Sequence, residues 1–440
     1  MEPRHHGISE RRLIFLLGAV QFVNALDFMI LMPLGPDLAS ALGIPVSHLG
    51  MVGGSYTAAA AVAGMAGALF LDRFDRRRAL AVAMVGLVLA TAAGALARGF
   101  GSLVGARLMA GACGGPAAAL CLAILADMVP PERRGKATAA IMGAFSVASV
   151  IGVPAGLELA RAGGWRTPLL AVAGLGALVA VSALALLPPM ARHLERTGRP
   201  AAVRPMREFL TDRGVLLALG GTCTVFMASF LLIPNLSAFF QFNRGFPRER
   251  LGLLYMVGGI VTFAAMRWGG AVVDRRGPLS VATAATALFL ADLAFGLLPA
   301  HSLLPVLVVF VGFMVGNAVR IVAFNTLASQ VPPPAERARF MSSLSAVQHL
   351  SAAVGAVVSS ALLTERADGA LVGVPSMVVA AMVLVAVLPL LVALIVRLRR
   401  PPSAAADRDP RVRLGNISTA PVVVPVKDAA PHRASRRRLH

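Results

Sequence analysis

The 440-residue chain is far more apolar than a water-soluble protein, and it is strongly basic. Hydrophobic residues make up 57% of it and charged residues 14%, against about 25% charged residues in an average soluble domain. Its 41 lysines and arginines outnumber its 21 aspartates and glutamates, which gives a formal net charge of +20. This composition excludes a single water-soluble core and indicates a protein embedded in a membrane.

Twelve segments of the sequence are long and apolar enough to cross a bilayer. About 20 residues at about 1.5 Å per residue cover the hydrocarbon core, and each must be helical because lipid cannot satisfy an unpaired backbone. The segments cover residues 13–34, 48–71, 79–97, 102–128, 137–160, 167–187, 215–241, 251–273, 281–299, 303–329, 340–363 and 371–396. We therefore predict an all-α membrane protein with twelve transmembrane helices.

The basic residues of this arrangement gather on one side of the membrane. They fill the N-terminal segment, the loops that follow even-numbered helices and the C-terminal tail. By the positive-inside rule both termini are then cytoplasmic, in the inner (plasma) membrane of the cell, and the charge requires no nucleic-acid partner. We expect residues 1–12 to form a cytoplasmic N-terminus and residues 397–440 a disordered basic tail.

A polar stretch at residues 188–214 divides the predicted helices six and six, and three short signatures repeat across it. Each recurs after 202 residues: Leu49-Gly50 at Leu251-Gly252, Asp72-Arg73 at Asp274-Arg275, and Val129-Pro130-Pro131 at Val331-Pro332-Pro333. A common displacement predicts two pseudo-symmetric six-helix bundles, 13–187 and 215–396, joined by a cytoplasmic linker at 188–214. Two such bundles can rock about a site between them, so transport is the leading function.

The turn between the second and third helices, GALFLDRFDRRR, concentrates charge between two apolar segments. Its Asp72 and Arg73, and its basic pair Arg76 and Arg77, are placed as in the signature loop of the major facilitator superfamily, which this turn resembles. Ala68 and Asp75 stand where that pattern has its two glycines. The turn therefore carries part of the superfamily motif.

A second copy of the motif, GAVVDRRG, keeps both glycines with Asp274 and Arg275 but lacks the basic pair. With the twelve-helix layout and the loops VPPERRGK and VPPPAERAR, the resemblance covers residues 13–396. It implies the superfamily's fold, in which two six-helix bundles expose a central site to each side of the membrane in turn.

The resemblance also implies a conformational latch at the cytoplasmic side. Asp72 and Arg76, with Asp127 at the end of helix 4, would form a chain of charges that holds this side closed in one conformation. Asp274 and Arg275 occupy the corresponding place in the second half. The alternative is that the arginines of the turn only set the topology.

An aspartate and an arginine lie within predicted helices of the first half. Asp27, in QFVNALDFMILMPLGPDL, stands at the acidic position of a first-helix signature that resembles proton-coupled drug and sugar efflux members, and Arg107, in LVGARLMAGACGG, matches the fourth-helix arginine. Charges inside a membrane need partners, so we expect the two to meet, with a proton on Asp27 cancelling the attraction. A permanent structural ion pair is the alternative.

Helix 5 carries a pattern of small residues and proline, GAFSVASVIGVPAGLELARAGGW. Gly143, Gly152, Pro154 and Gly156 are similar to the signature of the antiporter branch, whereas Leu157 departs from its drug-efflux form. These residues permit close helix approach and a bend, which a purely structural role would also require.

Other polar residues in the spans are candidates for the wall of a substrate cavity. Arg320 could bind an anionic substrate group or a carboxylate, and Asn24 and Asn235 lie on helices that border the cavity in this superfamily. Asn325 and His349 complete the set. Hydrogen bonding between helices is the alternative role for each of them.

These observations predict a secondary transporter that exports drugs, sugars or metabolites by alternating access in exchange for protons. A passive facilitator or symporter of the same fold is the alternative, and an integral membrane enzyme a distant one. The sequence shows no phosphate-binding GxxxxGK[ST] motif and no zinc spacing, so we expect no cofactor, no metal and no catalytic residue. The expected partners are a small-molecule substrate, protons and the bilayer, with the protein a monomer.

Overall fold

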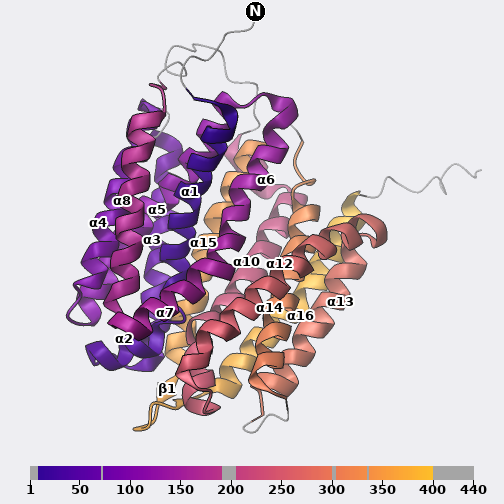
Figure 1. Ribbon diagram of the computed structural model, residues 1–440. Coiled ribbons are helices and arrows are strands. Elements are labelled where there is room, and N and C mark those ends of the chain that lie inside the picture. Colours follow the sequence, from indigo (N-terminus) through magenta and orange to yellow (C-terminus); the bar gives the residue numbers. More distant parts are fainter. Residues whose placement is uncertain (1–7, 71–72, 191–204, 300–303, 334–335, 400–440) are drawn as a thin grey trace, which may run out of the picture. The chain divides into compact units, whose positions relative to one another are not determined.

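The structure of the chain is a computed structural model that describes residues 8–70, 73–190, 205–299, 304–333 and 336–399 (Figure 1). Within these ranges, twelve helical segments are long and apolar enough to cross a membrane. The predicted all-α fold with twelve membrane helices is thereby confirmed. Asp72, most of the predicted linker and nearly all of the predicted tail fall outside the described residues.

The first six spans occupy the N-terminal half of the described chain. They consist of α1 (Glu10–Ile30), α3 (Leu49–Phe70), α4 (Arg76–Ala95), α5 (Phe100–Met128), a composite of α6 (Pro131–Val147), the π-helical η3 (Ala148–Gly152) and α7 (Val153–Gly163), and α8 (Arg166–Leu186). Two short elements, α2 (Gly35–Leu42) and η1 (Val46–His48), connect the first two spans.

The last six spans follow a short helix, α9 (Met206–Thr211). They consist of a composite of α10 (Arg213–Leu232), η5 (Ile233–Asn235), α11 (Leu236–Ala238) and η6 (Phe239–Asn243), then η7 (Arg248–Arg250) with α12 (Leu251–Arg276), α13 (Pro278–Asp292) with η8 (Leu293–Leu297), α14 (Val306–Ala328), α15 (Arg337–Leu362) and α16 (Val374–Arg399). A two-stranded hairpin of β1 (Thr364–Glu365) and β2 (Leu371–Val372) joins the last two.

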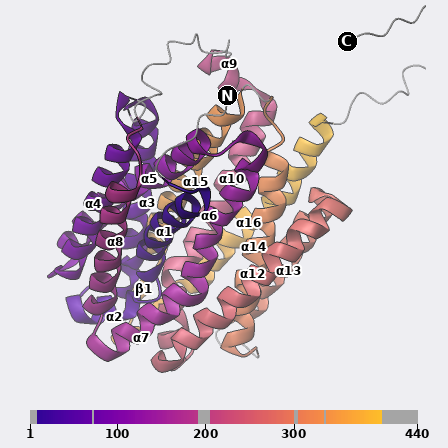
Figure 2. The same ribbon diagram turned by 45° about the horizontal axis from the view of Figure 1, so that its top comes forward.

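Helices within each half pack mainly against one another (Figures 1 and 2). In the first half α5 packs against α3 and α4, α8 against α4, and α1 against α6 and α8. In the second half α14 packs against α12 and α13, and α15 against α10. This grouping agrees with two bundles, while the predicted boundaries of those bundles remain a prediction.

The two halves meet through small residues. The helix α3 packs along α15, where Gly50 lies against the carbonyl oxygen of Ala356, and α12 packs against η3 and α7. A Cβ on Gly50 would collide with that carbonyl group, so only glycine permits this approach of the two backbones. The first span, α1, begins at Glu10. We call the opposite end of the spans, where α1 ends and α3 begins, the far end. Gly50 lies there, in the first turn of α3.

Local sequence explains how helices begin and end at the other end of the spans, where Glu10 lies. Asp75 caps α4, because its Oδ1 accepts a hydrogen bond from the Arg78 amide at 3.0 Å, and its Oδ2 accepts one from the Met190 amide at 2.6 Å. Between α12 and α13 the chain turns on Gly277 alone, whose φ of 82° lies in the region that favours glycine. The two helices therefore diverge directly from a single-residue turn.

Candidate functional site

A buried ion pair joins α1 to α5 in the first half. The Asp27 side chain is fully buried and Arg107 is 3% exposed. The Arg107 Nη1 donates to Oδ2 of Asp27 at 3.1 Å and to Oδ1 at 3.2 Å, and its Nη2 donates to the Asp27 carbonyl oxygen at 3.3 Å. The structure thus brings together the two residues that the sequence predicts to meet, and their role in proton coupling remains a prediction.

A threonine on a third helix completes the contacts of the carboxylate. The hydroxyl of Thr91, on α4, lies 2.7 Å from Oδ1 of Asp27 and 2.8 Å from the carbonyl oxygen of Leu87. It has one proton and can donate to only one of these acceptors at a time. The same hydroxyl can therefore donate to a charged carboxylate or accept from a protonated one.

Tyr56, on α3, links the ion pair to a second polar contact. Its ring lies under the guanidinium group of Arg107, at 4.7 Å from the ring centroid. Its hydroxyl donates to Oδ1 of Asn24 at 2.8 Å, and the Asn24 amide donates to the Gly114 carbonyl oxygen at 3.0 Å. Asn24, a predicted cavity residue, is therefore occupied in bonds between helices.

The resulting polar cluster of Asn24, Asp27, Tyr56, Thr91 and Arg107 draws on four helices, and every member is buried. Sequence reasoning did not identify Tyr56 and Thr91. A signal existed for Thr91, since it is the single hydroxyl in the otherwise apolar run from 79 to 97.

Part of the predicted latch is present at the end of α5. Arg76 forms an ion pair with Asp127, and its Nη1 also donates to the carbonyl oxygen of Ala123 at 3.0 Å. Asp72 lies outside the described residues. Asp274 and Arg275 are exposed at the end of α12, and no described residue forms a hydrogen bond or ion pair with either side chain.

The predicted helix 5 motif packs against α1 over part of its length. Gly152 faces Leu26 and Gly156 faces Ile30, in both cases so closely that a Cβ would displace the neighbouring side chain. Pro154 is the second residue of α7, which follows the π-helical segment directly, whereas the space beside Gly143 is open. Close approach therefore explains two of the three glycines, and the antiporter role of the motif remains a prediction.

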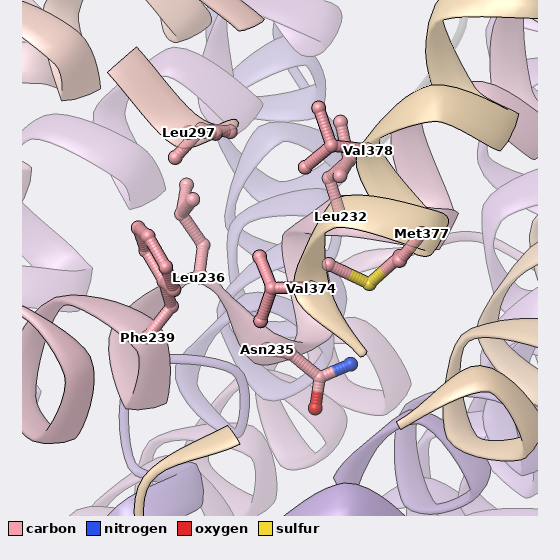
Figure 3. Close-up of a pocket in the computed structure, with 8 residues that line it drawn as sticks. All are labelled: Leu232, Asn235, Leu236, Phe239, Leu297, Val374, Met377 and Val378. Atoms are coloured by element: carbon pink, nitrogen blue, oxygen red, sulfur yellow. The ribbon is translucent and has the colours of Figure 1, made fainter. Parts of the chain in front are cut away.

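Asn235 lies in the wall of a small cavity in the second half (Figure 3). The cavity has a volume of about 10 Å³ and is lined by Leu232, Asn235, Leu236, Phe239, Leu297, Val374, Met377 and Val378. The Asn235 amide donates to Oγ of Ser359 at 2.7 Å, and its Oδ1 is buried without a described partner. A cavity of this volume holds about one water molecule, so it is too small for an organic substrate.

The remaining cavity candidates lie apart from this cavity. Arg320 is fully buried, and its guanidinium group stacks on Phe289 of α13 at 4.7 Å, with no hydrogen bond to any described residue. Asn325 is exposed and His349 is half-buried. The structure does not collect the five candidates into one pocket, and their contact with substrate remains a prediction.

Three contacts join the two halves at the far end, and sequence reasoning did not anticipate them. Nε of Arg248 donates to the carboxylate of Asp37 at 3.0 and 3.1 Å, with both side chains about three-quarters buried. Oγ of Ser360 accepts from the Met51 amide at 3.1 Å, and the Glu365 carboxylate accepts from the Val46 amide. These bonds must break if the halves separate at that end.

Within the described ranges, no cluster of three or more histidine, cysteine or acidic side chains could hold a metal ion. The site combines a buried, paired carboxyl group in one half with polar contacts between the halves, an arrangement that agrees with a carrier.

Two known proteins similar to this chain are named for chloramphenicol resistance and chloramphenicol efflux. It is 28% identical to a chloramphenicol resistance protein of Streptomyces lividans over 353 residues, which are 80% of this chain and 88% of that protein. It is 33% identical to a chloramphenicol efflux pump of Mycobacterium tuberculosis over 167 residues, 37% of this chain and 40% of that protein.

The fold is also that of a solved transporter. A bacterial homologue of the human lysosomal transporter Spinster, in an inward-facing and unoccupied conformation, superposes with a TM-score of 0.70 at 16% identity and covers 89% of this chain and 98% of its own. The family model described as Major Facilitator Superfamily matches residues 17–356. That match spans more than half of the sequence, and this chain belongs to the Major Facilitator Superfamily.

Proposed function

We propose that the protein exports small organic molecules in exchange for protons and that Asp27 is the group that binds the proton. The observation that carries this proposal is the burial of the Asp27–Arg107 pair between α1 and α5. A charge at this depth is expensive unless it is paired, and a carboxyl group can become neutral by taking up a proton. The pair is thus sensitive to protonation in a way that an apolar contact is not.

The proton step changes three contacts of the carboxyl group. When a proton binds one Asp27 oxygen, the attraction between opposite charges across α1 and α5 is lost. The new hydroxyl group can donate to Oγ of Thr91, which then turns its own proton from the carboxylate to the Leu87 carbonyl oxygen. Arg107 then keeps the Tyr56 ring and the Asp27 carbonyl oxygen as partners. The change in charge biases the equilibrium between conformers without leaving the carboxyl group unpaired.

The conformers that this equilibrium connects differ at the two ends of the spans. The contacts of Asp37 with Arg248 and of Ser360 with Met51 would hold the far end closed in this conformer. The Arg76–Asp127 pair is intact in the same conformer and joins two helices of the first half, so it can contribute to closure of the other end without having to break when the far end is closed. Alternating access requires that the contacts between the halves at the far end break when that end opens.

Export of drug-like compounds is favoured by the relatives, of which one is named a chloramphenicol resistance protein and another a chloramphenicol efflux pump. We place the protein in the inner membrane as a monomer with both termini cytoplasmic, on the strength of the basic loops. A passive facilitator of the same fold would need no buried titratable pair.

The test uses everted membrane vesicles with radiolabelled chloramphenicol as the probe. Wild-type vesicles should accumulate it when their interior is acidified and lose the accumulation when the pH gradient is collapsed. Asp27→Asn should show the low, gradient-independent level, whereas Asp368→Asn, at an exposed hairpin carboxylate, should behave as wild type. Full gradient-driven accumulation by Asp27→Asn would refute the coupling assignment.

A further inference from the structure

A groove on the second half is separate from the proposed proton site. It lies between α12 and α13, with α14 as its floor, and has a cavity volume of about 260 Å³. Figures 1 and 2 both show α13 at the margin of the helical body, beside α12 and α14. The lining residues are Val272, Arg276, Ser280, Val281, Ala284, Ala285, Leu288 and Val319.

The polar and apolar parts of this groove are segregated along its length. Arg276 and Ser280 lie at one end, beside the Gly277 turn, and the other six lining residues are apolar. From Ser280 to Leu288 the helix rises about 12 Å, close to half of the roughly 30 Å hydrocarbon core. The groove therefore has the depth of one lipid leaflet, with its polar end at the membrane surface.

The apolar wall faces the membrane rather than the core of the protein. Val272 is 37% exposed and Leu288 is 51% exposed, and both flank the groove. In a membrane such surface is covered by hydrocarbon, and the shape of a groove suits a single chain. A transported organic substrate would need polar groups that converge along its length, and these occur only at one end.

The polar end favours an anion. Arg276 is exposed, and no described residue forms a hydrogen bond or an ion pair with its side chain. The first turn of α13 begins at Pro278 and leaves backbone N–H groups without helical partners beside it. Phosphate is attracted both by such N–H groups and by an arginine side chain.

We propose that this groove binds an anionic phospholipid, with one acyl chain along Val281, Ala284 and Leu288 and the phosphate at Arg276. The neighbouring Arg275 is equally charged and exposed but does not line the groove. A lipid in this groove would contact Val272 and Arg276 of α12, and α12 packs against η3 and α7 of the other half. The lipid thus contacts a helix that takes part in the interface between the halves.

The experiment uses the purified full-length protein in detergent with two photoactivatable lipids that carry the same diazirine-labelled acyl chain. One has a phosphatidylglycerol headgroup and the other phosphatidylcholine, and labelled peptides are mapped by mass spectrometry. Phosphatidylglycerol should label α13 between Ala284 and Leu288 more strongly than phosphatidylcholine. Arg276→Gln should lower this labelling about fivefold, as expected for one arginine near an anionic surface, while Arg275→Gln should leave it unchanged. Both variants retain the basic tail, so a difference in labelling between Arg276→Gln and Arg275→Gln reports on the groove and not on the tail.

A second pair of variants tests the apolar part. Ala284→Trp fills the groove and should abolish labelling, whereas Ala287→Trp, exposed on the same helix outside the groove, should not. Ala284→Leu replaces the tryptophan variant if the latter does not give a monodisperse protein. Equal labelling by the two lipids, equal labelling of Arg276→Gln and wild type, or an unaltered Ala284→Trp pattern would overturn the proposal. The proposal would also be overturned if light scattering showed a dimer and α13 could be labelled only after this dimer dissociates.

Discussion

The carboxylate of Asp27 and the guanidinium group of Arg107 lie 3.1 Å apart inside the first half, with neither side chain more than 3% exposed. The pair connects α1 to α5, and Thr91 adds a contact from α4. Attraction between opposite charges is strong in such surroundings, and either charge becomes costly when its partner is removed. The stability of the fold thus depends on the contact that we propose to respond to protons.

Replacing Arg107 should destabilise the protein more than replacing both members of the pair. Arg107→Gln leaves the Asp27 carboxylate buried without its counter-charge, which costs about 3–5 kcal/mol in other buried pairs. The double variant Asp27→Asn/Arg107→Gln should recover much of that loss. Thermal unfolding in detergent measures both, and equal unfolding temperatures for the single and double variants would contradict a coupled pair.

Removing the Thr91 hydroxyl should impair transport while leaving the fold intact. Hydrogen bonds to charged groups contribute about 1.5–3 kcal/mol, so Thr91→Val should lower gradient-driven transport about tenfold or more. Thr91→Ser, which keeps the hydroxyl, should recover most of the rate. Thr57→Val is the matched control, because the Thr57 hydroxyl is also buried but donates to the Gly54 carbonyl oxygen of its own helix. Equal losses in Thr91→Val and Thr57→Val would point to a packing effect.

Breaking the contact between Asp37 and Arg248 should open the far end of the halves. Asp37→Asn removes the charge that Arg248 contacts, and the exchange Asp37→Arg/Arg248→Asp should restore it. A cysteine introduced at Ser47, which is 6% exposed in η1, reports the opening through its rate of modification by a maleimide. The rate should rise in Asp37→Asn and fall again in the exchanged variant. No change in either would show that this contact does not hold the end closed.

The latch contact should affect the speed of transport more than binding. Arg76→Gln removes the partner of Asp127, so turnover should fall while substrate binding by the purified protein persists. Arg78→Gln is the control, since this exposed arginine lies on the same turn and has no described side-chain partner. Comparable turnover in the two variants would leave topology as the role of these arginines.

The twelve helices and the central ion pair were predictable for the same physical reason. Lipid forces a long apolar segment to be helical, and it forces a charge within such a segment to find a partner. Asp27 and Arg107 are the charged residues deep in the first-half spans, so their meeting follows from burial alone. Neither inference needed the angles at which the helices cross.

Other features depend on those crossing angles or lie beyond the hydrocarbon core. Tyr56 reaches Arg107 because glycines such as Gly111 let α3 and α5 approach, which the sequence of either helix does not reveal. The helix α2 and the strand β1 form in segments predicted only as loops, and the strand β2 occupies the first two residues of the predicted last span, since water imposes no rule on backbone conformation beyond the hydrocarbon core. Asn235, whose contact with substrate remains a prediction, lies where its span changes from α-helical to 3₁₀ geometry, directly after Pro234.

The most direct test of the account counts protons at Asp27. Purified protein in weakly buffered detergent should release protons when chloramphenicol is added, and Asp27→Asn should bind the compound without releasing any. A matched variant at a surface carboxylate, Asp368→Asn, should release as many protons as wild type. Undiminished proton release from Asp27→Asn would contradict the central claim, because the exchanged proton would then reside on another group.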